Sequence, residues 1–330
     1  MFDNFLKKDK YLDCHYMKHS IHFFYDKIKT CCTNIYGPIL YDDYSGEKID
    51  WNYVYNFRKK MVKNINSPFN KNAIPKVCEG CYEINHYISD KKIEPFENKI
   101  DRLYFHNVMS CNAKCNYCAY SHVEKGYKYN VVPFIQELID KNILSKDSEV
   151  YMSGGEITIY PEFEALLNLL LSHLNSRIEI LTNGIKYSQA IFDCFKEDKC
   201  SLIVSIDSGT KETFKNIKQV DCFDKVVDNL KKYISASETA KEHLLLKYII
   251  VDDFNDNKEE IKAFIDIAVS IGIKQVRIDI DYEKYKFERN LKVPQSYLEL
   301  INYFNELAKE NSMTVLHFDQ VDQILERSFN

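Results

Sequence analysis

Short apolar runs alternate with amphipathic segments along most of the chain beyond residue 100. The short runs have the length and composition of β-strands, and the segments between them repeat apolar residues every three or four positions, as helices do. The expected strands lie at 101–108, 148–156, 177–184, 200–210, 243–251 and 274–280, and the expected helices at 131–144, 161–174, 187–198, 211–217, 223–237 and 257–272. Strands that alternate with helices predict an α/β fold with a parallel sheet.

The first 98 residues do not follow this alternation. Residues 20–32 resemble a β-hairpin with a turn near Asp26 and Lys27, and 51–65 resemble a helix. Residues 66–75 contain the Asn, Ser and Pro residues that are typical of a loop. We therefore expect three parts, namely a small cysteine-rich α+β domain at 1–98, an α/β domain at 99–281, and a C-terminal helical extension at 282–330 whose helix at 294–311 begins at Pro294.

Glycines gather at one edge of the expected sheet. The chain has 9 glycines, and Gly154, Gly155, Gly184 and Gly209 each stand where an expected strand has just ended. Tight turns alone could require glycine at these places. Because ligands bind at the carboxyl ends of parallel strands, the concentration of glycines there favours a binding site at this edge.

Composition and charge narrow the functional classes. The chain has 330 residues, of which 45% are hydrophobic and 28% charged, as is ordinary for a globular protein. A net charge of -5 offers no basic stripe, so we expect no non-specific binding of nucleic acid. The amino terminus lacks a signal-like apolar segment and no apolar run reaches the roughly 18 residues of a membrane span, so we expect a cytoplasmic protein. In a reducing compartment the 11 cysteines are expected to be metal ligands or buried apolar residues.

Three cysteines follow the first expected strand of the α/β region. Cys111, Cys115 and Cys118 are separated by three and then two residues. Four thiolates would close a zinc site or saturate a cubane iron–sulfur cluster, whereas three leave one iron open to a substrate or cofactor. A zinc knuckle completed by His106 or His122, or a set of merely buried thiols, is the alternative.

The spacing of these cysteines, with the aromatic Tyr117 before the third, resembles the signature of the radical S-adenosylmethionine (SAM) superfamily. The resemblance implies a partial (β/α)6 TIM-like barrel over about 100–280, a 4Fe–4S cluster with one open iron, and SAM as the second cofactor. It also implies a reaction in which SAM chelates the open iron. One electron from the reduced cluster then cleaves SAM to methionine and a 5′-deoxyadenosyl radical. That radical then abstracts a hydrogen atom from the substrate, and Tyr117 would lie beside the ligand of the open iron.

Further segments match the same superfamily in order. "SGGE" (153–156) resembles its Gly-Gly-Glu element, in which Gly154, Gly155 and Glu156 suit the ammonium of the methionine part of SAM. "LTNG" (181–184) resembles the corresponding element of members that act on peptides and offers Asn183, which could instead be a turn former.

The fourth expected strand contributes "VSIDS" (204–208), in which alternation would place Ser205 and Asp207 on one face. If that face is the barrel interior, the two side chains could bond the ribose and carboxylate of SAM or orient the substrate. A polar strand end is the alternative. Lys247 and Arg277, on the next two strands, are weaker candidates for an anionic group, and solvated charges are as good an interpretation.

A second cysteine set lies before the barrel. "KVCEGCYEI" has a two-residue spacing that suits zinc or one corner of an iron–sulfur cluster. Together with the hairpin segment it resembles the SPASM and twitch auxiliary-cluster domains, and the resemblance implies the ligands Cys14, Cys31, Cys78 and Cys81, with Cys32 as a substitute for Cys31. Zinc, supported by His15, His19 and His22, and unligated thiols are the alternatives. Cys194, Cys200 and Cys222 lack partner spacing and are expected to be buried thiols.

The resemblance therefore predicts a radical SAM enzyme with an amino-terminal SPASM/twitch-like domain that holds a second 4Fe–4S cluster. Such an enzyme needs a one-electron donor such as flavodoxin or ferredoxin. Modification of a peptide or protein side chain is the first expectation for its substrate, and a sugar, nucleotide or other small metabolite is the alternative. An iron–sulfur or zinc-binding redox scaffold that does not cleave SAM is the alternative from another class.

Overall fold

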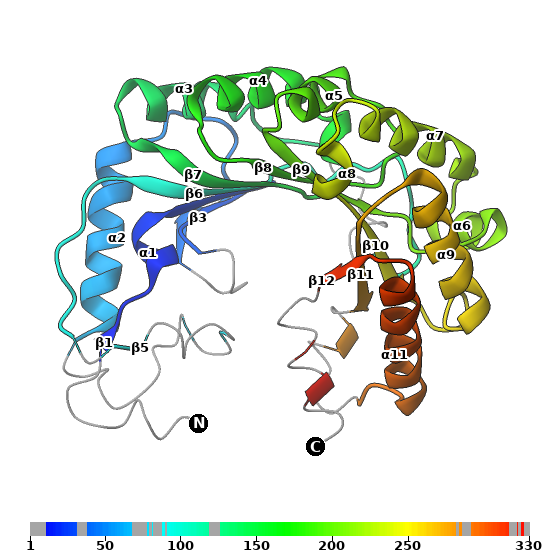
Figure 1. The fold of residues 1–330 in the computed structure, drawn as a ribbon. Helices are drawn as coiled ribbons and strands as arrows, with labels where there is room; N and C mark the ends of the chain where they lie inside the picture. The colour runs from blue at the N-terminus through cyan, green and yellow to red at the C-terminus, as the bar shows by residue number, and fades with distance from the viewer. Residues whose placement is uncertain are drawn as a thin grey trace. The chain divides into compact units, whose positions relative to one another are not determined.

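The computed structural model describes residues 11–31, 38–67, 78, 81, 88–89, 91–118, 126–281, 284–285, 292–316, 322 and 325–326. These residues form two compact units. The first comprises the described parts of 1–108, 126–154 and 164–176, and the second those of 109–125, 155–163 and 177–330. Figure 1 shows the helices and strands of both.

The first unit contains a mixed sheet. Its described strands stand in the order β4 (Ile39–Tyr41), β3 (Ile28–Lys29), β2 (Ser20–Phe24), β6 (Ile100–His106) and β7 (Leu144–Met152). The β2, β6 and β7 strands run parallel, while β3 and β4 are antiparallel additions. Two short strands, β1 (Tyr11–Leu12) and β5 (Ile88–Ser89), form a separate antiparallel pair.

A buried aromatic pair joins β2 to β6 in this sheet. Phe23 pairs with Phe105 in register, both are fully buried, and their rings stack with centroids 5.4 Å apart. The helices of this unit are α1 (His15–His19), α2 (Trp51–Ile65), α3 (Val132–Asp140) and, from Glu164 onward, α4 (Phe163–His173). Asp50 caps α2 by accepting hydrogen bonds from the backbone N–H groups of Asn52 and Tyr53, as preferred N-cap residues do.

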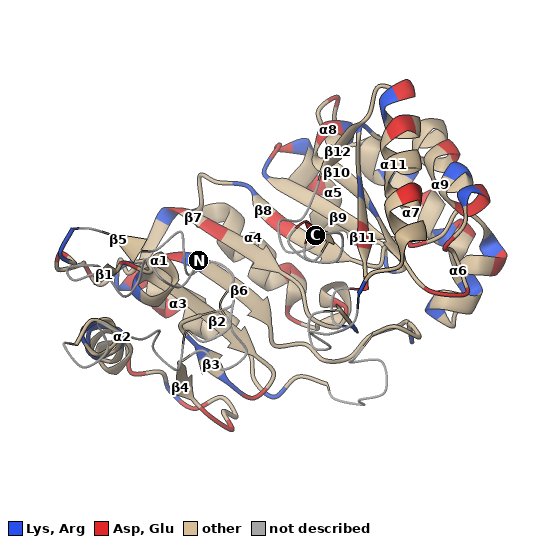
Figure 2. Ribbon diagram, turned by 90° about the horizontal axis from the view of Figure 1, so that it is seen from below, with Lys and Arg blue, Asp and Glu red and all other residues tan. Residues whose placement is uncertain are grey.

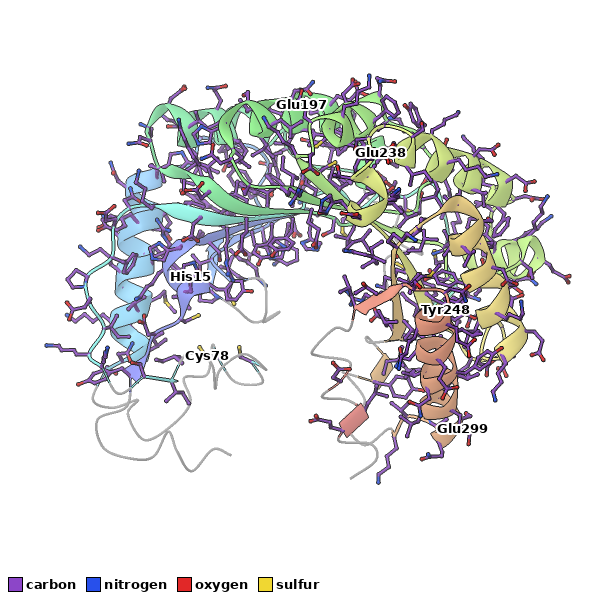
Figure 3. All side chains as sticks on the ribbon, in the orientation of Figure 1. His15, Cys78, Glu197, Glu238, Tyr248 and Glu299 are labelled. Carbon is purple, nitrogen blue, oxygen red and sulfur yellow. The ribbon has the colours of Figure 1, made fainter. Side chains whose placement is uncertain are left out.

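The second unit is a parallel sheet with helices on its outer side (Figure 1). Its described strands are β8 (Ile178–Thr182), β9 (Cys200–Ser205), β10 (Leu244–Ile250), β11 (Gln275–Ile280) and β12 (Thr314–Leu316), in that order. The helices are α5 (Gln189–Lys196), α6 (Lys211–Lys218), α7 (Phe223–Ile234), α8 (Ala240–His243), α9 (Lys258–Ile271) and α11 (Gln295–Glu310), with a short turn η5 (Ile157–Ile159). Tyr248 on β10 (Figure 3) packs on Phe264, which in turn packs on Phe304.

The described elements confirm most of the expected pattern. All six expected strands are present as β6 to β11, the hairpin turns between β2 and β3, and α2 has the predicted bounds. The helix expected at 131–144 ends earlier, because Asn142 takes a left-handed conformation and Leu144 begins β7. Pro161 precedes α4 rather than lying in its first turn. The loop predicted at 66–75 lies outside the described residues beyond Ser67.

The predicted domain boundaries at 98/99 and 281/282 stay predictions. The compact units divide the chain differently, because β2 of the expected amino-terminal domain pairs in parallel with β6 of the expected barrel. Basic and acidic side chains both occur along α6, α7 and α9 of the second unit (Figure 2). Among the described helices, none combines the length and the apolar character needed to cross a bilayer.

A buried chain of polar side chains crosses the first unit from β2 to the end of β7. His22 Nε2 contacts His106 Nδ1, and His106 Nε2 lies 2.5 Å from the Ser153 hydroxyl oxygen. Burial lowers the pKa of His106 to about 4 and that of His22 well below its ordinary value. Both imidazoles are therefore neutral near pH 7 in the folded protein.

We expect these buried imidazoles to make the first unit sensitive to mild acid. An unfolded histidine has a pKa near 6.5, so the unfolded state binds more protons than the folded state between about pH 6.5 and 4. The free energy of unfolding should therefore fall as pH falls through this window, and His106 should contribute about 2 kcal/mol of this fall between pH 7 and pH 5. Urea midpoints at pH 7 and pH 5 should differ less in His106→Gln than in wild type, and equal differences would contradict this.

Arg58 on α2 is a buried cation that ties three segments of the first unit together. It is fully buried and donates to the Lys18 carbonyl at 2.7 Å, the Lys99 carbonyl at 3.2 Å and Asn98 Oδ1 at 2.9 Å. Burial lowers the pKa of Arg58 to about 10. Because its partners are neutral oxygens, the guanidinium acts here as a hydrogen-bonding crosslink.

Replacement of Arg58 should destabilise the first unit. We expect Arg58→Met to lower the free energy of unfolding by about 2–4 kcal/mol, because it leaves buried acceptors without donors. The exposed Lys60 on the same helix offers a matched control, and Lys60→Met should leave the urea midpoint nearly unchanged. Equal midpoints for Arg58→Met and wild type would show that the crosslink contributes nothing.

Candidate active site

The cysteine segment lies against the end of α6 within the second unit. The backbone N–H of Lys114 donates to the Lys218 carbonyl, and that of Asn116 donates to the Ile217 carbonyl, both at 3.0 Å. These carbonyls belong to the last turn of the helix, where no intrahelical donor remains. The helix end therefore fixes the middle of the cysteine segment through backbone contacts that need no particular side chain.

The three thiols of this segment are accessible to different degrees. Cys111 is exposed, whereas Cys115 and Cys118 are partly buried. Although Cys111 is exposed at the surface, the protein atoms around its sulfur exclude part of the water and raise the pKa of the thiol to about 11, and the nearby Glu156 carboxylate adds to the rise. Burial also raises the pKa of Cys115, although the charge of Lys218 opposes this. Metal binding requires thiolates, so protons would leave these thiols when a metal enters.

The donor set fits three corners of a cubane cluster. Within the described part of the chain, no three His, Cys, Asp or Glu side chains converge on one point as they would around a single metal ion. Thiolates of a 4Fe–4S cluster bind different irons, so they surround a group larger than one ion and need not meet at a single point. The Ala113 backbone N–H already points at Cys111 Sγ at 3.4 Å, which is the type of contact that tunes cluster sulfurs.

Glu156 forms the centre of a buried network beside this segment. Its Oε1 accepts from the Thr158 N–H at 3.1 Å, the Thr158 hydroxyl at 2.6 Å and the Thr182 hydroxyl at 2.7 Å. Its Oε2 accepts from the Asn183 N–H at 2.7 Å. Three of these bonds fall on Oε1 and one on Oε2, so Oε2 keeps an acceptor position. The carboxylate positions the end of β8, and its direct contact with the ammonium of SAM stays a prediction.

Glycine is required next to Glu156 because the backbone approaches the cysteine segment closely. A Cβ on Gly155 would lie 2.2 Å from the Ser110 carbonyl oxygen, and the Glu156 N–H donates to the same oxygen at 2.9 Å. In the first unit, Gly154 has a φ of +117°, which side-chain-bearing residues rarely adopt. The Gly-Gly pair thus has structural reasons of its own, besides the predicted contact with SAM.

Asn183 links the end of β8 to the first cysteine. Its Nδ2 donates to Asn112 Oδ1 at 2.7 Å and lies 3.5 Å from Cys111 Sγ, while its Oδ1 accepts from the Ile185 N–H at 3.0 Å. The last bond is the local turn expected of asparagine, and the first two contact the cysteine segment. The structure therefore brings together Cys111, Asn183 and, through the Asn183 N–H, Glu156.

Asp207 lies beyond the end of β9, so strand alternation cannot place it on the same face as Ser205. Strand β9 ends at Ser205, and Asp207 has a φ of +53°, so strand alternation does not extend to it. Asp207 is fully buried, and its Oδ1 accepts from the Ile249 N–H at 2.9 Å. The Tyr117 hydroxyl donates to its Oδ2 at 2.7 Å, and the Lys218 ammonium contacts the same atom. Ser205 is half-buried on the strand.

Tyr117 anchors the cysteine segment in the second unit. Its ring packs against the buried side chains of Ile217, Ile249 and Val251. Burial raises the pKa of Tyr117 well above its ordinary value, and the charge of Asp207 adds to this. A position beside the ligand of an open iron, as predicted from the resemblance, stays a prediction, while the contacts to α6 and β10 show what holds the ring.

Lys247 and Arg277 share one acidic partner. The Lys247 ammonium lies 3.2 Å from Asp279 Oδ2, and Arg277 Nε and Nη2 each lie 2.9 Å from the Asp279 carboxylate. Lys247 pairs in register with both Ser205 and Arg277, so the three side chains form a row across β9, β10 and β11. This placement keeps both cations near the same sheet edge as Ser205.

The amino-terminal cysteines gather in the first unit. Burial raises the pKa of Cys14, and the charges of Cys31, Cys78 and Cys81 raise it further, so the four thiols lie within electrostatic reach of one another. Burial likewise raises the pKa of Cys78 to about 12. Cys78 (Figure 3) and Cys81 pack beside the small apolar cluster of Leu12 and Ile65. Cys32 lies outside the described residues.

The nearby histidines have other partners. His15 Nε2 lies 2.8 Å from Asp101 Oδ1, and His19 Nδ1 lies 3.3 Å from the Lys99 carbonyl oxygen. His22 contacts His106. Each contact occupies one ring nitrogen, while His22 Nδ1 is buried without a hydrogen-bond partner.

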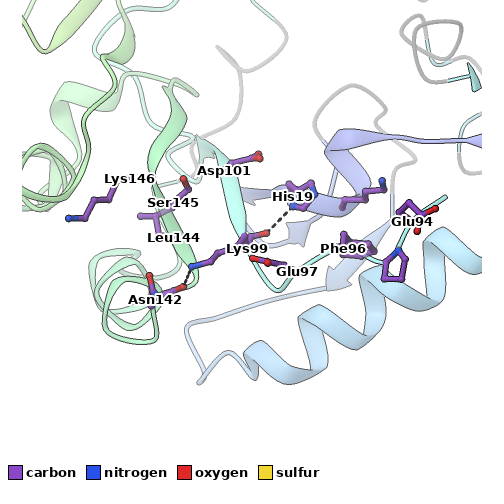
Figure 4. Close-up of a pocket in the computed structure, with 12 residues that line it drawn as sticks. His19, Glu94, Phe96, Glu97, Lys99, Asp101, Asn142, Leu144, Ser145 and Lys146 are labelled. Carbon is purple, nitrogen blue, oxygen red and sulfur yellow. Dashed lines mark hydrogen bonds between the residues drawn. The ribbon is translucent and has the colours of Figure 1, made fainter. Parts of the chain in front are cut away.

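A cavity of about 630 Å³ opens beside α1 in the first unit (Figure 4). Its lining includes His19, Phe96, Lys99 and Asn142, and the Lys99 ammonium donates to the Asn142 carbonyl at 2.6 Å. The cavity lies at the amino-terminal ends of β6 and β7. Ligands of parallel α/β proteins bind at the opposite, carboxyl ends, so this cavity is not the candidate active site.

Sequence reasoning missed the two residues that organise the site most directly. Lys218 stands one residue beyond the helix expected at 211–217, although it is the last residue of α6 and is fully buried. Thr158 stood in a connecting segment, and its hydroxyl is a main partner of Glu156. A lysine among apolar helix positions and a threonine two residues after Glu156 were the available signals, and both occur commonly without such a role.

Parallel strands with a three-thiol loop beside their carboxyl ends characterise this α/β protein. Residues 109–268, just under half of the chain, match the model of the Radical SAM superfamily. The fold of the chain is mixed α/β with a large parallel sheet, consistent with a partial TIM-like radical SAM barrel.

Known proteins similar to the chain include two cyclases and one solved structure. A probable GTP 3′,8-cyclase of Saccharolobus islandicus (strain Y.N.15.51 / Yellowstone #2) is 23% identical over 208 residues, which cover 61% of this chain and 65% of the relative. A GTP 3′,8-cyclase of Pasteurella multocida is 25% identical and covers 52% of each chain. Streptococcus suis SuiB bound to S-adenosylmethionine superposes with a TM-score of 0.51 at 12% identity, over 82% of this chain and 56% of SuiB. The chain thus spans just under two thirds of the first relative's length, and the likeness to SuiB concerns the fold alone.

The close approach at Gly155 yields a test of the site. We expect Gly155→Ala to lower the free energy of unfolding by about 1–3 kcal/mol, because its Cβ would overlap the Ser110 carbonyl oxygen. Iron uptake at the cysteine segment should fall as well. Gly126 is the matched control, since nothing lies within 4 Å of a Cβ added there. A Gly155→Ala variant that matches Gly126→Ala in both urea midpoint and iron content would refute the docking described above.

Proposed function

We propose that this protein is a radical SAM enzyme that cleaves SAM reductively and abstracts a hydrogen atom from a substrate. The observation that carries the proposal is the cysteine segment itself. It is fixed to the end of α6 by backbone bonds and to the end of β8 by Asn183, and it lies within the residues that match the Radical SAM superfamily. When bound, the 4Fe–4S cluster and SAM would supply the electron transfer and radical chemistry.

The residues of this chain would bind and orient those groups. Cys111, Cys115 and Cys118 would ligate the cluster. SAM would be bound by the residues at the adjacent strand ends, namely Tyr117, Gly154, Gly155, Glu156, Asn183, Ser205 and Asp207. The contacts described above support different roles within this set. The carboxylates of Glu156 and Asp207 accept four and three hydrogen bonds from internal partners, which supports a positioning role, whereas Asn183 and the half-buried Ser205 are better placed for direct contact.

A peptide or protein is our first proposal for the substrate. Streptococcus suis SuiB bound to its precursor peptide SuiA has a similar fold, with a TM-score of 0.50 at 13% identity. The sequence relatives favour the alternative, a nucleotide or other small metabolite, because they are named as GTP 3′,8-cyclases. Measurement of 5′-deoxyadenosine with and without added GTP separates the two, since GTP should stimulate its formation only if the substrate is a nucleotide.

We also propose a second metal site in the amino-terminal part. Cys14, Cys31 or Cys32, Cys78 and Cys81 would ligate an auxiliary 4Fe–4S cluster of SPASM/twitch type within a domain at 1–98. The mutual electrostatic influence of the described thiols supports one shared site. Zinc is the competing metal for four thiolates. A one-electron donor such as flavodoxin or ferredoxin would be the redox partner of this cytoplasmic enzyme.

Anaerobic reconstitution with iron and sulfide tests the proposal. We expect about eight irons per chain, as two cubane clusters require, and 5′-deoxyadenosine from SAM under reductant. A Cys111/Cys115/Cys118→Ala triple variant should lose about four irons and all SAM cleavage. A Cys14/Cys78/Cys81→Ala variant is the matched control and should lose the other irons while its first cluster stays.

Three other results would change the proposal in defined ways. About four irons with bound zinc would assign a structural role to the amino-terminal site. Full iron content without SAM cleavage, in the presence of peptide or nucleotide substrates, would favour the redox scaffold. Retention of all iron in the Cys111/Cys115/Cys118→Ala variant would refute the assignment of the cluster ligands.

A further inference from the structure

We propose that Lys218 is a positioning residue that sets the electrostatics of the iron–sulfur site. Its buried ammonium, held by Asp207 and Tyr117, places a fixed positive charge beneath the cysteine segment and makes a cluster bound there easier to reduce. This inference rests on the proposed function, because it concerns the cluster that Cys111, Cys115 and Cys118 would ligate. It assigns a role to a residue outside the predicted ligand and cofactor sets.

Lys218 contacts the cysteine segment in two ways. As the last residue of α6, it accepts a hydrogen bond at its carbonyl from the Lys114 N–H at 3.0 Å. Its side chain reaches the aromatic anchor of the same segment, since Nζ lies 3.2 Å from the Tyr117 hydroxyl and 5.6 Å from the centre of the Tyr117 ring. One residue thus joins the helix end, the segment and the buried carboxylate.

The ammonium is held in place by burial and by its partners. The side chains of Lys218 and Asp207 are 2% and 0% exposed, and Lys218 Nζ contacts Asp207 Oδ2. Asp207 is fixed in turn by the Tyr117 hydroxyl at 2.7 Å and the Ile249 N–H at 2.9 Å. A buried ion pair is costly to form, and the cost is offset only when further hydrogen bonds satisfy both groups. Because a buried ion pair adds little to the free energy of unfolding, its presence here favours a functional role for the Lys218 charge.

The Lys218 ammonium lies close to the cysteines of the segment. Its Nζ is 3.2 Å from the hydroxyl of Tyr117, which stands two residues after Cys115 and directly before Cys118. Burial lowers the pKa of Lys218, but the charges of Asp207, Cys115 and Cys111 outweigh burial, so the pKa lies above its ordinary value. Lys218 therefore stays charged and lies within electrostatic reach of two cysteines of the segment.

A fixed cation has a definite effect on cluster reduction. Reduction adds one negative charge to a cluster that already carries thiolate charge, and in a low-dielectric site a nearby cation stabilises the reduced form more than the oxidised form. Loss of the cation should make the midpoint potential more negative. An exposed cation at a similar distance has a smaller effect, because water and salt screen it.

The midpoint potential tests this inference independently of turnover. We would reconstitute the full chain anaerobically, titrate it with dithionite in the presence of redox mediators, and follow the reduced cluster by electron paramagnetic resonance. To isolate one cluster, every protein would carry Cys14/Cys78/Cys81→Ala. We expect a more negative midpoint in Lys218→Met than in this background, and a return toward the background value in Lys218→Arg.

A matched control and a second variant keep the test decisive. Lys215 is on the same helix but its side chain is 59% exposed, so Lys215→Met removes the same charge and should leave the midpoint unchanged. Lys218→Met alone leaves Asp207 without its buried partner and could fail to fold. The Lys218→Met/Asp207→Asn variant removes both charges, and its midpoint should also be more negative, by less than in the single variant.

The outcomes separate this inference from the proposed function. Unchanged midpoints in both Lys218→Met and Lys218→Met/Asp207→Asn, with the cluster retained, would overturn the inference and leave the enzyme class intact. An equal shift in Lys215→Met would also overturn it, because the effect would then be non-specific. Absence of any cluster from the background protein would instead refute the proposed function.

Discussion

The docking of the cysteine segment on the end of α6 is the constraint on which the candidate site depends. A helix terminus has carbonyl groups without intrahelical partners, and here two of them accept bonds from the segment. The contact uses backbone groups, so it fixes the chain path while the cysteine side chains remain available as ligands. The Tyr117 ring adds an apolar anchor, and its hydroxyl adds a polar one.

A second constraint comes from the buried Glu156 carboxylate. It accepts bonds from residues on η5 and at the end of β8, which lie 2 to 27 positions away in the sequence. The Glu156 N–H and the missing Cβ of Gly155 let the same backbone approach Ser110. The buried Glu156 carboxylate thus orders the connecting segments around it, and its hydrogen-bond partners offset the free-energy cost of removing the charge from water.

The candidate ligands could be predicted from local spacing, but the partners of those ligands could not. Cysteines at intervals of three and two residues are visible in any reading of the chain, and so are glycines after strands. Lys218 lies 101 residues from Tyr117, and Tyr117 lies 90 residues from Asp207. Contacts at such separations depend on which strands are neighbours, and periodicity gives no information about that. The alternation argument for Asp207 failed for the related reason that the strand ends at Ser205.

The sequence by itself determined the order of strands and helices, the bounds of α2, the hairpin and the cysteine spacing, because these features depend on residues that are close along the chain. Only the tertiary structure decided that β2 pairs with β6, that the Glu156 and Asp207 carboxylates accept several internal hydrogen bonds, and that Lys218 is buried beside the cysteine segment. The physical reason is that burial and hydrogen-bond satisfaction are properties of the packed chain. A lysine or a carboxylate acquires its role only when folding removes water from around it and supplies the partners that replace that water.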